Sequence, residues 1–349
     1  TWDFLIGNWL PADASFSDGA DVLFDDSGVA SAPVLLATDV TPRDITLATT
    51  NNAYTLDTDN HTLTARYVAK LGAAALTLKG RHQYNILNVG QIVGSTYEGG
   101  GTLTLDGTLA IGTVLTVRPG ANTFSQLATA VIEGPGDITL GSSADLRGTN
   151  TFDGTATLGY ADQVKTFTLY NDRALGSTVG GTVLRGGTSS SYNRLRIADG
   201  VTVTDEPLTV TGGSGRRAGL WSLDGGTACW DGDILIAADG QLQIGSANGS
   251  TFTIGSLGRT VITNVGTVTV SFRDAGTVIL NSRLAMPTAS FNRDDRGTLV
   301  IRSSDNKVTG IGLPEGTIRL EADAAFVTPP TLAIGKGANN VGNKATLDL

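Results

Sequence analysis

The sequence has little of what builds disulfide frameworks and metal centres. It contains one cysteine and two histidines among 349 residues. A single cysteine cannot form a disulfide within the chain or an all-cysteine metal site. This cysteine, Cys229, lies between Ala228 and Trp230 in an apolar run, so we interpret it as a buried, unreactive thiol rather than as a nucleophile.

Charge is also scarce, and no long apolar run is present. Charged residues make up 16% of the chain, against about a quarter in an average soluble domain. No stretch approaches the length of apolar sequence that a membrane-spanning helix needs. The 33 acidic and 24 basic residues are scattered and leave a net charge of −9. An acidic chain is a poor partner for phosphates or anionic lipids, so we predict no nucleic-acid partner and no membrane insertion by this segment.

Both ends of the sequence suggest a piece of a larger protein. The first residue is Thr1 rather than Met, and no secretory signal pattern is present. The last residues, ATLDL (Ala345–Leu349), continue a strand-like pattern. We therefore expect the native polypeptide to be longer.

Glycine, threonine, serine and asparagine fill the places that charged residues leave. The 46 glycines and the many asparagines supply turns with positive φ, and threonine suits a pleated surface. Hydrophobic residues make up 40% of the chain, which is enough for a core. The composition predicts an ordered β protein with many turns.

Short alternation of apolar and polar residues recurs along the chain, while helical periodicity is nearly absent. The one run rich in helix formers, Ala69–Leu78, is interrupted by Gly72. Alternating segments of four to six residues, each closed by a turn residue, predict strands. Such segments include Thr102–Leu105, Val114–Val117, Asp137–Leu140, Thr166–Leu169, Val201–Thr204, Leu208–Thr211, Asp233–Ile236, Gln241–Ile244, Thr251–Ile254, Thr277–Leu280, Thr298–Ile301, Thr317–Leu320 and Thr331–Ile334.

A solenoid explains these strands better than a sandwich or a barrel. The same short unit recurs, turn pairs repeat at Asp199-Gly200, Asp224-Gly225 and Asp239-Gly240, and composition shows no boundary from Gly99 onward. Stacked coils would bury the apolar residue of each coil against that of the next. At roughly 20–25 residues per coil, residues 99–349 would form about ten to twelve coils and a rod of roughly 50–60 Å.

Large aromatic side chains are concentrated in the first hundred residues. We interpret residues 1–98 as the opening coils of the solenoid with a possible cap, continuous with the repeats of residues 99–349. The end of a solenoid needs covering because an open coil is an exposed sheet edge. The aromatic residues concerned are Trp2, Trp9, Phe16, Phe24, Tyr54 and Tyr67.

Two motifs carry a resemblance to a known family. GTNTFDGTATL (Gly148–Leu158) and NDRALGSTVGGTVLRGG (Asn171–Gly187) resemble the autotransporter-associated β-strand repeat of bacterial secreted and surface proteins, and Ser303–Phe326 is a weaker echo. The segments Trp2–Gly28 and Val40–Leu56 resemble the lead-in of such regions. Phe152-Asp153 departs from the family's Tyr-Thr.

The resemblance implies a fold and a setting but no active site. It implies an all-β, right-handed, single-stranded parallel β-helix that is secreted or exposed on the bacterial cell surface. The family shares no catalytic residue, so none is carried over to this chain. The translocator barrel expected of an autotransporter is not in this sequence.

Motifs for nucleotides and calcium are incomplete. GGSGRRAG (Gly212–Gly219) matches a dinucleotide loop, but strand-like residues follow where a helix is required, so we interpret it as a turn. Asp57–Val68 begins like a calcium loop but has Thr62 and Val68 where Gly and Glu are needed. We predict no cofactor and no metal.

Candidates for catalysis are few. No G-x-S-x-G elbow accompanies His61 or His82, which we interpret as exposed polar residues. The adjacent Asp294 and Asp295 could serve a glycan-cleaving enzyme only from a turn, because in a strand they would point to opposite faces. The pair Asp25-Asp26 reads as a turn.

Trp221 and Trp230 could line a glycan-binding groove, but core packing is the favoured interpretation. We therefore assign no catalytic, cofactor-binding or metal residues. We expect a non-enzymatic surface protein (a passenger stalk, an adhesin or a fibre subunit) with self-association end to end and surface glycans as possible partners. The alternative is a polysaccharide-binding or polysaccharide-degrading β-helix; a trimeric phage tailspike is a further alternative.

Overall fold

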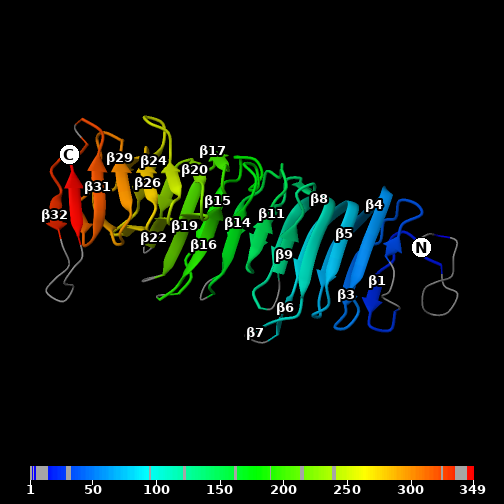
Figure 1. Ribbon diagram of the computed structural model, residues 1–349. Helices are drawn as coiled ribbons and strands as arrows, with labels where there is room; N and C mark the ends of the chain where they lie inside the picture. The colour runs from blue at the N-terminus through cyan, green and yellow to red at the C-terminus, as the bar shows by residue number, and fades with distance from the viewer. Residues whose placement is uncertain are drawn as a thin grey trace. The chain divides into compact units, whose positions relative to one another are not determined.

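A computed structural model of the chain is an all-β parallel β-solenoid of about 13 turns (Figure 1). The structure describes residues 2, 4, 15–28, 33–93, 96–120, 123–160, 163–188, 190–212, 216–237, 241–323, 325–334 and 344–349. These residues form strands, bridges and turns, and no helix among them could cross a membrane. The predicted β-solenoid is confirmed, and the run Ala69–Leu78 contains the end of one strand, a connection over residues 71–75 and the start of the next strand.

The chain divides into two compact units, residues 1–157 with 173–180 and residues 158–172 with 181–349. The strands of the first unit are β1 (Val22–Asp25), β2 (Val34–Leu35), β3 (Asp44–Ala48), β4 (Tyr54–Lys70), β5 (Leu76–Val89), β6 (Gln91–Val93), β7 (Thr96–Glu98), β8 (Thr102–Val117), β9 (Thr123–Gln126), β10 (Val131–Glu133), β11 (Asp137–Leu140) and β12 (Ala144–Leu146), and β13 (Ala156–Leu158) lies at the division.

The strands of the second unit are β14 (Thr166–Leu169), β15 (Thr182–Arg185), β16 (Tyr192–Ile197), β17 (Thr202–Thr204), β18 (Leu208–Thr211), β19 (Arg217–Ser222), β20 (Thr227–Asp231), β21 (Ile234–Ile236), β22 (Gln241–Ser246), β23 (Thr251–Ile254), β24 (Val261–Asn264), β25 (Thr269–Arg273), β26 (Thr277–Leu280), β27 (Arg283–Ala285), β28 (Ser290–Arg293), β29 (Thr298–Ile301), β30 (Gly310–Leu313), β31 (Gly316–Leu320), β32 (Thr331–Ile334) and β33 (Ala345–Asp348).

Apolar residues of the first unit stack in columns inside the coils. Ile45 pairs with Val68, Val68 with Leu87, and Leu87 with Leu115, and all four side chains are fully buried. Alternation places every second side chain of a strand inside the coil. A shift of the pairing by one residue would move the apolar side chains outside, so burial of these side chains fixes the register. Pairing also runs from β5 to β8 across residues 98–99. The coils are thus continuous there, while a separate capping role for residues 1–98 remains a prediction.

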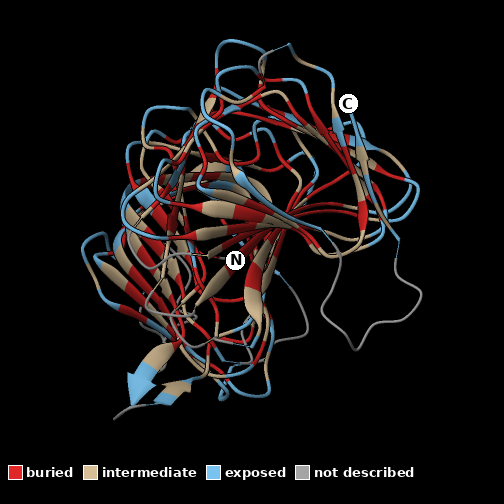
Figure 2. Cartoon of the chain, turned by 90° about the vertical axis from the view of Figure 1, so that its left-hand side faces the viewer, coloured by how far each residue is buried: buried red, intermediate tan, exposed pale blue. Residues whose placement is uncertain are grey.

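The second unit repeats the same arrangement, and several of its coils have three short strands. β16, β17 and β18 pair in parallel with β19, β20 and β21, one coil later. Figure 2 shows buried residues along the strands and exposed residues in many of the turns. Paired residues lie 19 positions apart at Thr298 and Thr317 but 29 apart at Gly316 and Ala345. The coil length therefore varies more than the predicted 20–25.

Threonines form an outward column beside this core. Thr251, Thr277, Thr298 and Thr317 pair in succession on four consecutive coils. Their neighbours along each strand, such as the fully buried Phe252, point inward. Threonine fits this half-exposed pleated position because its branched side chain packs well against its neighbours in the column.

An aromatic cluster lies where the first coils begin. Trp2 is fully buried and contacts Phe16 and Phe24 edge-on, with ring centroids 5.3 and 5.7 Å apart. Phe4 lies 5.5 Å from Phe16. Trp9 of the predicted lead-in lies outside the described residues. The aromatic concentration in the sequence therefore corresponds, at least for these rings, to one packed cluster.

The parts of the two repeat motifs that belong to the first unit, residues 148–157 and 173–180, stack on each other in successive coils. The N–H of Asn150 donates to the carbonyl oxygen of Arg173 at 3.0 Å, and the N–H of Ser177 donates to that of Phe152 at 2.9 Å. The buried Asn150 side chain accepts the N–H of Ile132 at 2.8 Å. The side-chain oxygen of Asn150 thus accepts a hydrogen bond from the preceding coil.

The weaker echo, Ser303–Phe326, uses the same geometry in the second unit. Asn306 is fully buried and accepts the N–H of Leu284 at 2.7 Å. Its Nδ2 donates to the carbonyl oxygen of Ala325, one coil later, at 2.7 Å. The predicted turn glycines Gly200 and Gly225 have φ of 74° and 86°, whereas the pair Asp239-Gly240 lies outside the described residues.

Candidate functional site

Many carboxylates in the chain bond one coil to the next. In each case an aspartate oxygen accepts a hydrogen bond from a backbone N–H group of the following coil. The carboxylate thus supplies a partner for an N–H group that the hydrogen bonds between strands leave unpaired. The pairs are Asp18–Thr41, Asp39–Thr62, Asp137–Thr155, Asp172–Thr202, Asp199–Thr227 and Asp233–Val261, at 2.6–2.8 Å. Several of the aspartates in this acidic sequence therefore have a structural role, which is to join neighbouring coils.

Of the pair Asp25-Asp26, Asp26 lies in a turn, as predicted, whereas Asp25 is the last residue of β1. Asp26 accepts the backbone N–H groups of Thr50, Asn51 and Asn52 at 3.0–3.2 Å. Hydrogen bonding, first from the N–H of Thr50, lowers the pKa of Asp26. This carboxylate is committed to holding the next coil.

The second acidic pair, Asp294-Asp295, lies in the turn that follows β28. Both carboxylates approach the Nε of Arg273, each with an oxygen 3.7 Å away. The two side chains therefore share one side of the chain, because the turn breaks the alternation that a strand would impose. Asp274 joins them, since its N–H donates to Asp295 Oδ2 at 3.0 Å.

Trp221 connects this acidic cluster to an aromatic stack. Its Nε1 donates a hydrogen bond to Asp274 Oδ2. The indole lies parallel to the ring of Tyr192, with centroids 4.9 Å apart and planes 5° apart. The guanidinium of Arg194 lies 4.7 Å from the Tyr192 centroid and 5.1 Å from that of Trp221. Glycine is required beneath the indole, because a Cβ at Gly245 would lie 2.0 Å from the Trp221 Nε1.

The two tryptophans differ in position although both are buried. Trp230 pairs with Val203 and Ile254 in an inner column, which confirms core packing for this residue. Trp221 pairs with Arg196 and Gly245 on the outward side and is covered by its neighbours. Its aromatic face is not an open stacking surface, so the arrangement is suited to holding coils together.

One polar group, the imidazole of His82, lies inside the coils against expectation. His82 occupies an inner column between Leu63 and Leu109 and is fully buried, so its interpretation as an exposed residue is wrong. Its Nε2–H donates to the carbonyl oxygen of Lys79 at 3.0 Å, and its Nδ1 accepts the Tyr84 hydroxyl at 2.8 Å. Burial lowers the pKa of His82 to about 4, so the ring is neutral at pH 7.

The other histidine and the cysteine lie nearer the surface. His61 is partly exposed and has its Nδ1 3.6 Å from Asp39. Cys229 is half-buried rather than fully buried. Burial, together with the charge of Asp231, raises the pKa of Cys229 to about 11. A high pKa keeps the thiol protonated and supports the interpretation of a poorly reactive cysteine.

Two weak motifs have structural explanations. Gly213, Ser214 and Gly215 of the glycine-rich stretch lie outside the described residues, and the strand β19 follows it, as predicted. Asp57 of the calcium-like segment is paired with Lys79, with an oxygen–nitrogen distance of 2.8 Å. Among the described residues, no group of three or more His, Cys, Asp or Glu side chains could hold a metal ion.

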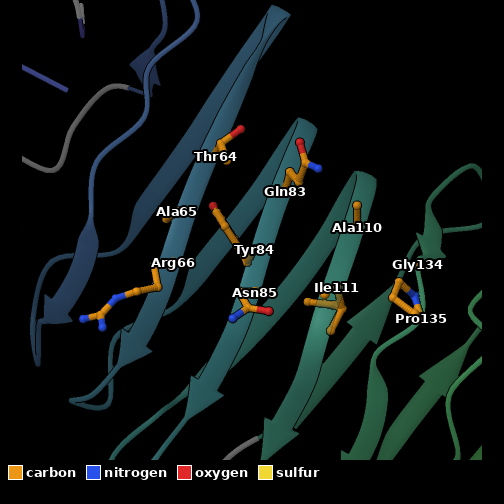
Figure 3. A pocket seen from close by; sticks show the side chains of 11 residues that line it. Thr64, Ala65, Arg66, Gln83, Tyr84, Asn85, Ala110, Ile111, Gly134 and Pro135 are labelled. Atoms are coloured by element: carbon orange, nitrogen blue, oxygen red, sulfur yellow. The ribbon is translucent and has the colours of Figure 1, made fainter. Parts of the chain in front are cut away.

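One hollow opens on the outer side of the first unit (Figure 3). Its volume is about 490 Å³, and it crosses β4, β5 and β8 beside the turn that follows β10. Apart from the calcium-like segment, which contains Thr64, Ala65 and Arg66, no sequence pattern marked the residues of this hollow. The hollow is lined by Thr64, Ala65, Arg66, Gln83, Tyr84, Asn85, Ala110, Ile111, Gly112, Gly134 and Pro135.

Comparisons with protein families, curated proteins and solved structures found no match to this chain.

Proposed function

We propose that this chain is a non-enzymatic structural segment of a bacterial secreted or cell-surface protein, such as a passenger stalk, an adhesin or a fibre subunit. The observation that carries the proposal is the use of polar side chains between coils. Asn150 and Asn306 each bridge neighbouring coils, and carboxylates such as Asp26 hold the next coil. Because these polar side chains bond neighbouring coils to each other, they are suited to making the solenoid rigid.

Self-association end to end is supported by an exposed edge in the second unit. Within the described residues, β32 pairs with β30 alone and β33 with β31 alone. Leu332 and Ile334 continue the inner columns of Ile311 and Leu313, yet they are 42% and 54% exposed. An apolar strand edge of this kind is a template for another strand. We propose that a second copy of the chain covers it.

Electron microscopy of the purified chain at several concentrations tests the structural role. The proposal expects filaments in the wild type and single particles in the double variant Leu332→Lys/Ile334→Lys. A second copy that paired with this edge would have to bury the two lysine charges, which opposes association. Leu257→Lys, at a residue that is 60% exposed outside the strands, is the control and should still form filaments. Single particles of the wild type at every concentration would overturn the proposal that the chain is a fibre subunit.

The alternative of polysaccharide cleavage rests on the cluster of Asp274, Asp294 and Asp295 beside Trp221. Carboxylates gathered on one side of a chain are what glycan hydrolysis needs. Reducing-end and unsaturated-product assays on a panel of polysaccharides test it. Cleavage that Asp295→Asn abolishes would establish the enzyme, and no product from any substrate would reject it.

A further inference from the structure

We propose that the hollow across β4, β5 and β8 is a binding groove for a neutral oligosaccharide. This inference does not rest on the structural role or on self-association. It follows from how the hollow is formed, which polar groups line it and how their charges are paired.

A β-bulge in β8 shapes the groove. Tyr84 pairs with Ile111 and Ile86 with Val114, so Asn85 alone faces the two residues Gly112 and Thr113. The Thr113 hydroxyl donates to Asn85 Oδ1 at 2.6 Å and fixes the bulge. Bulges bend a strand and redirect side chains, and they are common beside functional sites.

Small residues keep the floor of the groove low. Ala110, Gly112 and Gly134 project little or no side chain into it, as Figure 3 shows for Ala110 and Gly134. A Cβ at Gly112 would lie 2.7 Å from Asn85 Oδ1. One at Gly134, where φ is 101°, would lie 2.5 Å from the Ile111 carbonyl oxygen. The strand packing therefore requires the glycines that also leave the groove open.

Two polar groups of the groove, those of Thr64 and Gln83, are not used between coils. Thr64 and Gln83 alternate with the buried Leu63, His82 and Tyr84, so they point outward. Within the part of the chain that the structure describes, the Thr64 hydroxyl and the Gln83 carboxamide have no hydrogen-bond partner, in contrast to the corner aspartates.

This chemistry suits sugar hydroxyls. A carboxamide offers two donors and an acceptor, and a hydroxyl group of a sugar both donates and accepts. The Nδ2 of Asn85 adds two more donors, since only its Oδ1 is engaged among the described residues. Thr64, Gln83 and Asn85 lie on two adjacent strands and can address hydroxyls along one oligosaccharide.

Charge pairing favours a neutral ligand. The Nε of Arg66 donates to Asp44 Oδ1 at 3.0 Å, and a second bond joins the same two side chains. Arg81, two residues before Gln83, lies 3.6 Å from Glu133. Neither cation is left to attract an acidic sugar. A volume of about 490 Å³ is within the range of small-molecule sites.

The test is a glycan array of neutral hexasaccharides built from glucose, mannose, galactose or N-acetylglucosamine, followed by calorimetry with the tightest binder. Ala110→Trp fills the floor with an outward side chain and should abolish binding. Gln83→Ala should weaken it at least tenfold. Gln241→Ala, at a half-exposed glutamine in β22 of the second unit, is the matched control and should bind like the wild type.

Circular dichroism and the urea midpoint of each variant separate loss of binding from loss of fold. The proposal is overturned if no neutral hexasaccharide binds at millimolar concentration, or if only acidic sugars bind. Binding that Ala110→Trp leaves unchanged would also overturn it, because the ligand would then lie elsewhere. Filament formation is read separately by microscopy, so either proposal can fail without the other.

Discussion

The Nδ2 of Asn150 donates a 2.7 Å hydrogen bond to the carbonyl oxygen of Ala174, one coil further along the first unit. The same side chain accepts the N–H of Ile132 from the coil before. One buried amide thus joins three consecutive coils, which no backbone hydrogen bond does.

Asn150→Leu should lower the free energy of unfolding by about 2–3 kcal/mol, because it leaves buried donors and acceptors without partners. Ile132 and Ala174 would each lose one bond to this side chain, and Gln126 would lose two. Urea denaturation followed by circular dichroism measures the change. Asn60→Ala, at an exposed position, is the control and should cost under about 0.5 kcal/mol. Equal effects of the two substitutions would contradict the assigned role.

His82 should make the protein sensitive to acid. Its pKa is lowered from 6.5 to about 4 by burial, so the unfolded chain binds a proton before the folded chain does. The stability contributed by the neutral ring is complete above pH 6.5 and is lost as the pH falls towards 4. The expected loss is about 3 kcal/mol.

Unfolding free energies between pH 7 and pH 4 check this for the wild type and His82→Leu. The variant should be less stable at pH 7, since Tyr84 and Lys79 lose a partner, but should lose less stability on acidification. His61→Gln is the control and should follow the wild-type slope. Parallel slopes in all three proteins would refute the role of His82.

Glu206 should act in the opposite direction. It is buried and accepts the Thr182 hydroxyl at 2.7 Å, and burial raises its pKa from 4.5 to about 7. Its contribution to stability is complete below pH 4.5 and is lost as the pH rises to 7. Glu206→Gln keeps an acceptor for Thr182 and removes the charge, so it should stabilise the chain at pH 8 by up to about 3 kcal/mol and not at pH 4.

Thermal and urea unfolding at the two pH values measure this gain. Glu98→Gln, at an exposed position, is the matched control and should change stability by under about 0.5 kcal/mol at either pH. A gain in Glu206→Gln that is the same at pH 4 and pH 8 would show that ionisation is not its cause.

Gly245→Ala should displace the indole of Trp221, because the added Cβ would meet its Nε1 at 2.0 Å. We expect a loss of about 1–3 kcal/mol and a changed near-ultraviolet circular dichroism spectrum as the stack with Tyr192 opens. Gly310→Ala is the control, since its nearest neighbour would lie at 3.5 Å. An unchanged aromatic spectrum in Gly245→Ala would show that the indole can be accommodated otherwise.

Part of the candidate chemistry was visible in the sequence. The sequence offers Asp294 and Asp295 for glycan cleavage only if they lie in a turn, and it favours core packing for Trp221. The structure brings the two aspartates to one side of a turn that is linked to Trp221 through Asp274. The groove was not visible, because its bulge depends on Asn85 facing Gly112 and Thr113 from the next coil. The side chain of Gln83 can be recognised as part of a groove only when the bulge beside it is known.

The sequence by itself determined the strands, the glycine turns and the coil as the repeating unit, because alternation and positive φ are local properties of the chain. The expectation of positive φ at asparagine is wrong for the described residues, in which the non-glycine residues with positive φ are Asp59, Asp205, Asp274 and Asp305. It also marked the motif asparagines. Tertiary structure alone decided which polar side chains go inside. His82 and Lys70 are buried because they continue the inner columns of Leu63 and Leu47 in the preceding coil. Their partners depend on register between coils about twenty residues apart, which no local pattern encodes.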